Sequence, residues 1–445
     1  MSGEREREAA GPLRRVLTPA GLWGLGVAYV ISGMYFGWNL GLPAAGSAGF
    51  FAATLAATAT YVAFVLGYAE LACALPGAGG AFVYAGRAFG PFVGFLAGFA
   101  QALEFVFASP AIAVAIGAHA HLALPWLHPS IAAAIAYLLF TALNAYGVRQ
   151  SVAFGLWTAA AALVGLLVFA LATLPRVSTA ALASEALPGG WAGAFRALPY
   201  AVWFYLGIEG LANVAEEARD PQRDLPRGFG SAMATLVVAA LATFAGAVGV
   251  AGWRAAVFAP GSSEPSDAPL PLVIARVYGA GHPLHGALVA LGLVGLVASC
   301  HGLVLVAGRA LFALGREGLL PAALGRAHAT RATPVAALAA NCAAGLLAIV
   351  SGTSGFLITL SVLSALTMYG LALASLFALR AREPGLARPF RAPGHPALTA
   401  LALALVLACL VAVASAHPLE SALFAGVMAA GAVWFGVRRR RLGSA

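Results

Sequence analysis

The chain has 445 residues, of which 61% are hydrophobic and only 9% are charged. Because soluble proteins carry about 25% charged residues, this composition excludes an ordinary soluble domain and predicts a polytopic protein embedded in membrane lipid. The formal net charge of +9 does not indicate a nucleic-acid partner, since its arginines gather on one side of the predicted membrane topology.

Residues 1–20 are predicted to form a cytoplasmic tail. They are charged throughout, and they lack the short apolar core and the small-residue cleavage site of a signal peptide. We therefore expect the first membrane helix to act as the targeting signal.

Apolar stretches long enough to cross a bilayer recur along the chain and predict twelve membrane helices. Their approximate ranges are 21–42, 50–73, 92–119, 130–146, 154–174, 195–215, 231–253, 284–312, 334–350, 355–379, 397–415 and 418–437. The predicted fold class is therefore an all-α polytopic membrane protein. The longest connections, 175–195 and 254–282, are rich in Pro, Gly and Ser and are expected to hold only short helices.

The arginines predict the orientation of these helices. The chain has no lysine, and only Arg176, Arg196, Arg254 and Arg276 fall in loops on one side. Every other arginine lies in a tail or in a loop on the opposite side, and positively charged loops stay in the cytoplasm. We expect both termini to be cytoplasmic and the protein to lie in a bacterial inner membrane.

The first and sixth predicted helices are both interrupted by glycine. The first contains Ser32-Gly33 near its middle, within GLGVAYVISGMYFGWNLGL, and the sixth contains FYLGIEG, with Gly207 and Gly210. Glycine-interrupted helices at matching positions of two halves indicate a transporter site. The alternative is that these glycines only permit close helix packing.

This match predicts an inverted repeat of five plus five helices. The expected modules are the tail 1–20, a first repeat 21–174, a second repeat 195–379, two further helices within 397–437, and a basic cytoplasmic tail 438–445.

Three of the 16 acidic residues lie in or at apolar spans: Glu70, Glu104 and Glu209. Glu70 is near the cytoplasmic end of the second span, where a structural role is expected. Glu104 and Glu209 lie deeper, and no arginine lies at a comparable depth. Each is therefore either a neutral acid hydrogen-bonded to a neighbouring helix or a site that a cation visits.

Broken helices expose backbone groups that can bind a ligand. We expect the carbonyl groups near Tyr29, Trp203 and Leu206 to accept hydrogens of an ammonium group. The N–H groups from Ser32 through Gly33 to Met34 are expected to face an oxygen. Aromatic side chains that could cover a cation or gate the site lie in the same zone, and they are Tyr35, Phe107, Trp203, Phe204 and Tyr205.

The sequence predicts no enzyme, no cofactor and no metal site. The four cysteines are scattered through apolar spans without metal spacing. His119, His121 and His128 cluster at the outer end of the third span without acidic or cysteine partners, whereas His301 lies within the eighth span. We find no phosphate-binding loop, nucleophile elbow or zinc-binding helix motif.

Three segments resemble the amino acid–polyamine–organocation superfamily of transporters: YAELACALPGAGGAFVYAGRAFGPFVGFLAGF, FYLGIEGLANVAEEARDPQRDLPRG and GRALFALGREGLLP. VAYVISGMYFGWNLGL and LEFVFASPAIAVAIGA look like its ethanolamine permease branch. The resemblance implies a five-plus-five inverted repeat, with the substrate at breaks around Ser32-Gly33 and Gly207–Gly210. It also implies that Glu209 has a proton-dependent role in opening. Because the chain lacks the fifth-helix lysine that some proton-coupled relatives use, the coupling ion is left open between H⁺ and Na⁺.

The sequence thus predicts a secondary transporter that imports a small amine, with ethanolamine as the preferred candidate. Glu104 and the carbonyls of the breaks are expected to hold the ammonium group, the Ser32-Gly33 region to face the hydroxyl, and Glu209 to act as a protonation switch. An amino acid permease of the same fold is the alternative. A membrane receptor or channel is the rival from another class.

Overall fold

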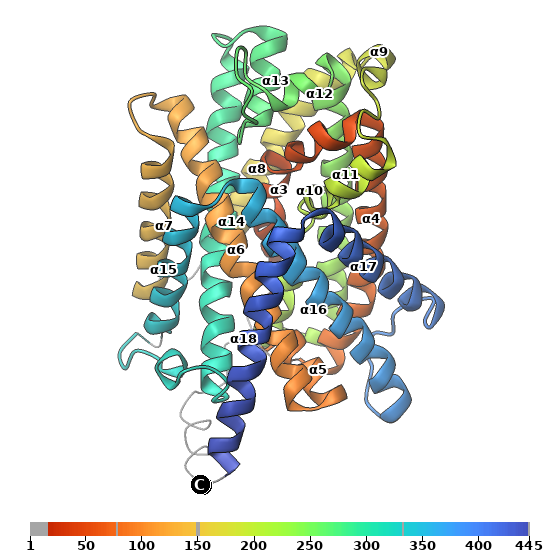
Figure 1. Cartoon of the computed structure of the whole chain (residues 1–445), viewed down its shortest axis with the longest axis vertical. Coiled ribbons are helices and arrows are strands. Elements are labelled where there is room, and N and C mark those ends of the chain that lie inside the picture. Colours follow the sequence, from red (N-terminus) through yellow and green to blue (C-terminus); the bar gives the residue numbers. More distant parts are fainter. Residues whose placement is uncertain (1–16, 77–78, 148–151, 332, 444–445) are drawn as a thin grey trace.

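A computed structural model of the chain describes residues 17–76, 79–147, 152–331 and 333–443. The described part is a bundle of helices with two isolated β-bridges and no named strand, which confirms the all-α class. The short helix α5 (Ala81–Phe89) and the C-terminal part of α18 lie at one end of the bundle, and α9, α12 and α13 lie at the other (Figure 1). We call these the α5 end and the α13 end.

Nine segments of the described chain are long and apolar enough to cross a membrane. The helices that form them are α4 (Leu42–Ala74), α6 (Pro91–Ala123), α7 (Pro129–Tyr146), α8 (Val152–Thr173), α11 (Pro221–Ala251), α14 (Pro283–Arg316), α16 (Ser354–Arg382), α17 (Ala397–Ala416) and α18 (Pro418–Gly443). The shorter apolar helix α15 (Val335–Ser351) and two interrupted segments complete the predicted set.

Proline begins many of these helices. Its missing N–H group costs nothing at the first helical position, and its fixed backbone angle suits a helix start. The helices that begin this way include α6, α7, α11, α14 and α18. The loops expected to hold only short helices contain α9 (Thr179–Ala183), α12 (Trp253–Val257) and α13 (Pro269–Tyr278).

The first interrupted segment consists of α2 (Pro19–Val30), α3 (Ser32–Tyr35) and the 3₁₀ helix η1 (Trp38–Gly41). Between α3 and η1 the backbone is extended at Phe36, and it has a positive φ of 89° at Gly37. A positive φ favours glycine, which explains why this break needs Gly37.

The second interrupted segment consists of α10 (Gly190–Val202) and the 3₁₀ helix η3 (Ile208–Glu217). The turn 203–207 joins them and ends at Gly207, whose φ is 106°. The two interrupted segments are joined at the α5 end, where Leu17 N–H donates to Glu217 O at 2.9 Å and Arg219 N–H donates to Leu17 O at 2.9 Å. The start of one broken segment is therefore fixed to the end of the other.

A buried ion cluster holds the α5 end together. Glu70 is completely buried in α4 and accepts hydrogen bonds from Arg380 and from the backbone N–H of Ala392. Its Oε1 also lies 3.4 Å from Nε of Arg388, whose side chain is 6% exposed. These contacts tie the chain after α16 to α4, in agreement with the structural role expected for Glu70.

We predict that Glu70→Gln destabilises the protein by about 3–5 kcal/mol, because removing one partner of a buried ion pair leaves an uncompensated charge. Thermal unfolding in detergent measures the change. The matched control is Glu383→Gln, since Glu383 pairs with Arg87 at the surface, where salt bridges contribute little. Equal unfolding temperatures for the two variants would contradict the proposed importance of the cluster.

The loop before α13 contains an acid with an unusual environment. Asn39 Nδ2 of η1 donates to Ser266 O at 2.8 Å, and the next residue, Asp267, faces the hydroxyl group of Ser354 at the start of α16. Burial raises the pKa of Asp267 from 3.8 to about 6, and the Ser354 hydroxyl opposes this shift. Between these pH values the folded protein holds a proton that the unfolded chain has lost.

We therefore predict that stability falls as the pH rises from about 4 to about 6, because the folded state favours protonated Asp267 in this window. Asp267→Asn should flatten this part of the profile of unfolding temperature against pH. Glu264→Gln, which changes an exposed acid of the same loop, is the control and should leave the slope unchanged.

Candidate functional site

The two deep acids lie together beside the second break. Glu104 of α6 and Glu209 of η3 are both completely buried, and their carboxyl groups lie within hydrogen-bonding distance of each other. Neither oxygen of Glu104 has a partner among the N–H and O–H donors of the described chain, and the same is true of Oε1 of Glu209. Neither acid forms an ion pair with a described arginine. The structure therefore joins two residues for which separate roles were predicted from the sequence.

Two tyrosines support this acid pair. The hydroxyl group of Tyr369 in α16 donates to Oε2 of Glu209 at 2.6 Å, and it lies 3.0 Å from the hydroxyl of Tyr61 in α4. Both tyrosines are completely buried. Tyr205 of the second break packs on Tyr61 with ring centroids 5.3 Å apart, and its hydroxyl lies 2.7 Å from Oγ1 of Thr58. Helices α4 and α16 thus contact the second break through one aromatic cluster.

A serine interrupts the backbone ladder of the first broken segment. Ser32 N–H donates to Oγ of Ser299 at 3.3 Å, and this hydroxyl donates in turn to Ala28 O at 2.6 Å. The side chain from α14 therefore replaces the direct bond between Ser32 and Ala28. Insertion of a side chain into the ladder is a known cause of a helix interruption, and it also satisfies backbone groups that lipid cannot.

This geometry corrects the expectation for the first break. The ladder is interrupted at Ser32 as expected, but Ile31 keeps helical angles and the chain unwinds only at Phe36–Gly37. The N–H groups of Ser32 and Met34 are occupied, the second by Ile31 O at 3.1 Å. They do not present the open set of donors that the sequence suggested for an oxygen.

Gly33 and Gly207 bring the two broken segments into contact. A Cβ atom at Gly33 would lie 2.5 Å from the carbonyl oxygen of Trp203, and one at Gly207 would lie 3.3 Å from that of Tyr29. Gly210 packs against the ring of Tyr29. Gly33 is therefore required for close approach, whereas Gly207 also supplies a left-handed turn.

The predicted aromatic residues divide into groups. Trp203 packs over Gly37 and against Phe36, with ring centroids 5.5 Å apart in the second contact, and Phe204 stacks on Trp38 at 5.7 Å. These rings form a layer between the two breaks. Leu206 lies in the same turn and is buried.

Tyr35 and Phe107 have other surroundings. The hydroxyl group of Tyr35 donates to Ala162 O of α8 at 2.6 Å, so this side chain braces α3 against α8. Phe107 is only half-buried, as is Leu103 on the preceding turn of α6, whereas Glu104 is completely buried. Neither position supports the expected direct role beside the acids.

Three residues of the site were not predicted from the sequence: Tyr61, Tyr369 and Ser299. Tyrosine and serine are common in membrane helices, and nothing in the local sequence links them to an acid far along the chain. The sequence signal that could have indicated these residues is the presence of polar side chains at a similar depth in several membrane spans. This signal identifies a site only when the packing of those spans is known.

The three histidines at the outer end of the third predicted span do not form a common site. His119 is buried with Nδ1 3.0 Å from Ala115 O, whereas His121 contacts Leu127 O and His128 accepts from Ser130 N–H. No group of three or more His, Cys, Asp or Glu residues suited to a metal occurs in the described ranges. His301 packs against the ring of Phe140 with centroids 5.8 Å apart.

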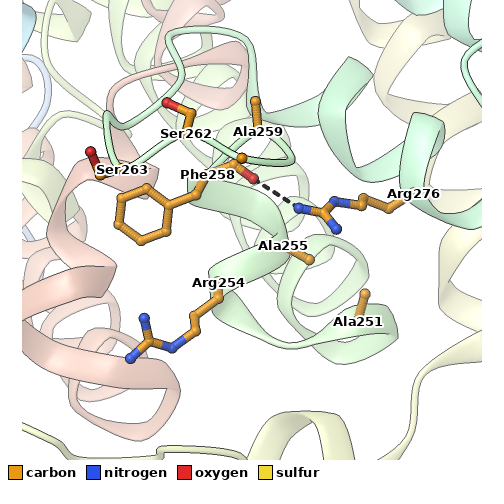
Figure 2. Close-up of a pocket in the computed structure, with 9 residues that line it drawn as sticks. Ala251, Arg254, Ala255, Phe258, Ala259, Ser262, Ser263 and Arg276 are labelled. Carbon is orange, nitrogen blue, oxygen red and sulfur yellow. Dashed lines mark hydrogen bonds between the residues drawn. The ribbon is translucent and has the colours of Figure 1, made fainter.

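Two surface cavities lie at opposite ends of the bundle, away from the acid pair. Figure 2 shows the cavity at the α13 end, which has a volume of about 540 Å³. In it Arg276 donates to Phe258 O, and the side chain of Arg254 points away from this hydrogen bond. Arg254 also pairs with Glu185. The other, of about 600 Å³, is lined by residues that include Arg223, Arg227 and Phe390. Both cavities lie at the surface and neither is lined by Glu104 or Glu209, so they are poor candidates for the central site.

Comparison with known proteins assigns the chain to a family. A model of the amino acid permease family matches residues 22–435. An uncharacterized transporter of Rhizobium meliloti (strain 1021) is 28% identical over 96% of this chain and 92% of its own length. The methylthioribose transporter of Bacillus subtilis (strain 168) is 25% identical over 80% of this chain and 81% of its own.

The D-serine/D-alanine/glycine transporter of Escherichia coli (strain K12) is 26% identical over 66% of this chain and 63% of its own. These findings confirm the resemblance at the level of the superfamily, while the ethanolamine permease branch stays a prediction. Since the family model spans nearly the whole sequence, the chain belongs to the amino acid permease family of membrane transporters.

Proposed function

We propose that this transporter imports a small amine cation, with ethanolamine as the most suitable substrate. The observation that carries the proposal is the completely buried pair of Glu104 and Glu209 at the second break, without an arginine partner in the described chain. An acid in a membrane interior is costly unless it is neutralised, and intramembrane acids commonly mark substrate or ion pathways. A primary ammonium group can neutralise this pair.

The ammonium group is proposed to lie between the acid pair and the carbonyl groups near Tyr29, Trp203 and Leu206. Breaks supply such carbonyls because their helical partners are absent. Tyr205 and Trp203 would close over the bound cation, and Gly207 would permit the movement. The region of Ser32, Gly33 and Met34 would face the hydroxyl end, where Ser299 offers a partner for a hydroxyl group.

An amino acid substrate is the second candidate, because relatives are named as transporters of amino acids. A zwitterion needs donors for its carboxylate, and the N–H groups of Ser32 and Met34 are already engaged. It would therefore have to displace Ser299. A cation with a small hydroxyl group needs no such displacement, which favours the amine.

The proposed orientation places the α5 end in the cytoplasm of a bacterium. The described arginines at that end include Arg87, Arg380 and Arg388, in agreement with the bias of positive charge towards the inside. Both termini would then be cytoplasmic. Import by alternating access would open the site first towards the α13 end and then towards the α5 end, with a proton as the favoured coupling ion.

Uptake of labelled ethanolamine into proteoliposomes tests the proposal. We predict saturable uptake that unlabelled ethanolamine inhibits strongly, lysine weakly, and alanine and glutamate hardly at all. Glu104→Gln should lower uptake at limiting substrate at least tenfold, because a charge-assisted hydrogen bond contributes about 1.5–3 kcal/mol. Glu383→Gln, at the surface of the α5 end, is the control.

Stronger inhibition of uptake by alanine than by ethanolamine would indicate that the substrate is an amino acid and not an amine. Undiminished uptake by the Glu104→Gln variant would remove Glu104 from the binding site. Flux without saturation would instead indicate a channel.

A further inference from the structure

We propose that Glu104 and Glu209 hold one resident proton and offer one negative charge, for which a second proton and the ammonium group compete, so that the carrier exchanges one amine cation for one proton. This inference rests on the proposed function and specifies how the same site is coupled: because a proton leaves for each amine that enters, import runs down the amine gradient and is not driven by an inward proton gradient.

The resident proton follows from the geometry of the pair. Two ionised carboxylates repel each other and have no hydrogen to share, whereas a carboxylic acid donates readily to a carboxylate. The carboxyl groups of Glu104 and Glu209 lie within hydrogen-bonding distance, and Glu104 has no other donor in the described chain. One proton between them joins the two carboxyl groups, leaves the pair with one negative charge, and leaves acid oxygen that can accept further hydrogens.

The groups that face the pair do not cancel this charge. Tyr369 of α16 donates to Glu209, and the hydroxyl of Tyr61 in α4 lies 3.0 Å from the hydroxyl of Tyr369. Tyr68 of α4 is completely buried, with Gln101 of α6 as a hydrogen-bond partner. The thiol of Cys409 in α17 lies near Tyr61. None of these groups is cationic.

The nearby arginine on α14 is already paired. Arg309 contacts Oε1 of Glu217 at 3.4 Å and lies near Tyr29. The net charge at the acid pair is therefore left for a mobile cation to neutralise. The acid oxygens that have no donor in the described chain mark where hydrogens of that cation can be accepted.

Charge balance makes the two cations mutually exclusive. A second proton makes the pair neutral, and so does one ammonium group beside the singly protonated pair. With the second proton and the ammonium group both bound, the site would carry a positive charge. With neither bound, it would carry a negative charge. A net charge of either sign is costly in the closed membrane interior. The carrier therefore changes between its outward-facing and inward-facing states with either an amine or a second proton bound.

The position of Glu209 links this occupancy to movement. Glu209 lies two residues after the left-handed Gly207, and Tyr369 holds it against α16. A change in the charge of Glu209 alters the strength of the bond with Tyr369, because hydrogen bonds to a charged group are stronger than neutral ones. This contact joins a broken segment to a continuous helix, so it can transmit the state of the pair.

The test uses purified protein in proteoliposomes with labelled ethanolamine outside and a pH-sensitive dye inside. We expect an acidic lumen to accelerate uptake and one proton to leave for each amine that enters. Because the exchange moves no net charge, a potassium diffusion potential set with valinomycin should leave the rate unchanged. External protons should raise KM about tenfold per pH unit in the acidic range without changing the maximal rate.

Variants separate a coupling role from a structural one. Tyr369→Phe removes the donor to ionised Glu209, so proton inhibition should reach its midpoint about one pH unit higher. Tyr84→Phe is the matched control, since Tyr84 is completely buried and its hydroxyl has no partner in the described chain. Glu209→Gln should shift the midpoint by at least one unit.

The possible outcomes distinguish failure of the proposed exchange from failure of the proposed function. Ethanolamine uptake accompanied by proton entry, or uptake driven by an inside-negative potential without proton movement, would overturn the exchange and leave the proposed function intact. An unchanged pH profile in Glu209→Gln would also overturn it. Absence of uptake of ethanolamine under every gradient would overturn the proposed function itself.

Discussion

The cost of a charge in the membrane interior is the constraint on which this structure depends. Glu70 and Glu209 are both completely buried, yet their surroundings differ. Glu70 is matched by Arg380 and Arg388 at the α5 end, where its role is to fix a loop. Among the described residues, Glu209 meets Glu104 and the hydroxyl group of Tyr369 and no arginine. A buried acid that is ion-paired with arginines stabilises the fold, whereas a buried acid without such partners leaves a charge that a mobile ligand can neutralise.

The broken segments exist because neighbouring side chains satisfy what the breaks expose. Ser299 completes the backbone ladder at Ser32, and Gly33 lets the carbonyl group of Trp203 approach the first segment. The pairing of Leu17 with Glu217 and Arg219 fixes the same two segments at the α5 end. Motion of either segment is therefore expected to involve the other, and Glu209 moves with the second of them.

The sequence predicted the membrane class, the spans and the two interrupted helices, because apolar length and glycine placement are local properties. It placed the first unwinding at Ser32-Gly33, but the chain unwinds at Phe36–Gly37, since Ser299 from a distant helix preserves the earlier turn. It identified both deep acids and treated them as separate. Their contact depends on the three-dimensional arrangement of segments far apart in the chain, which no local pattern contains.

The fold alone does not decide the substrate, because relatives named for methylthioribose and for amino acids match much of the same chain. The decision lies in a few side chains at the breaks. A zwitterion brings a positive and a negative group and adds no net charge, so it would leave the single charge of the acid pair uncancelled. A monovalent amine cancels it. The charge state of Glu104 and Glu209 therefore links selectivity to coupling: the condition that admits an amine is the same condition that requires a proton to leave.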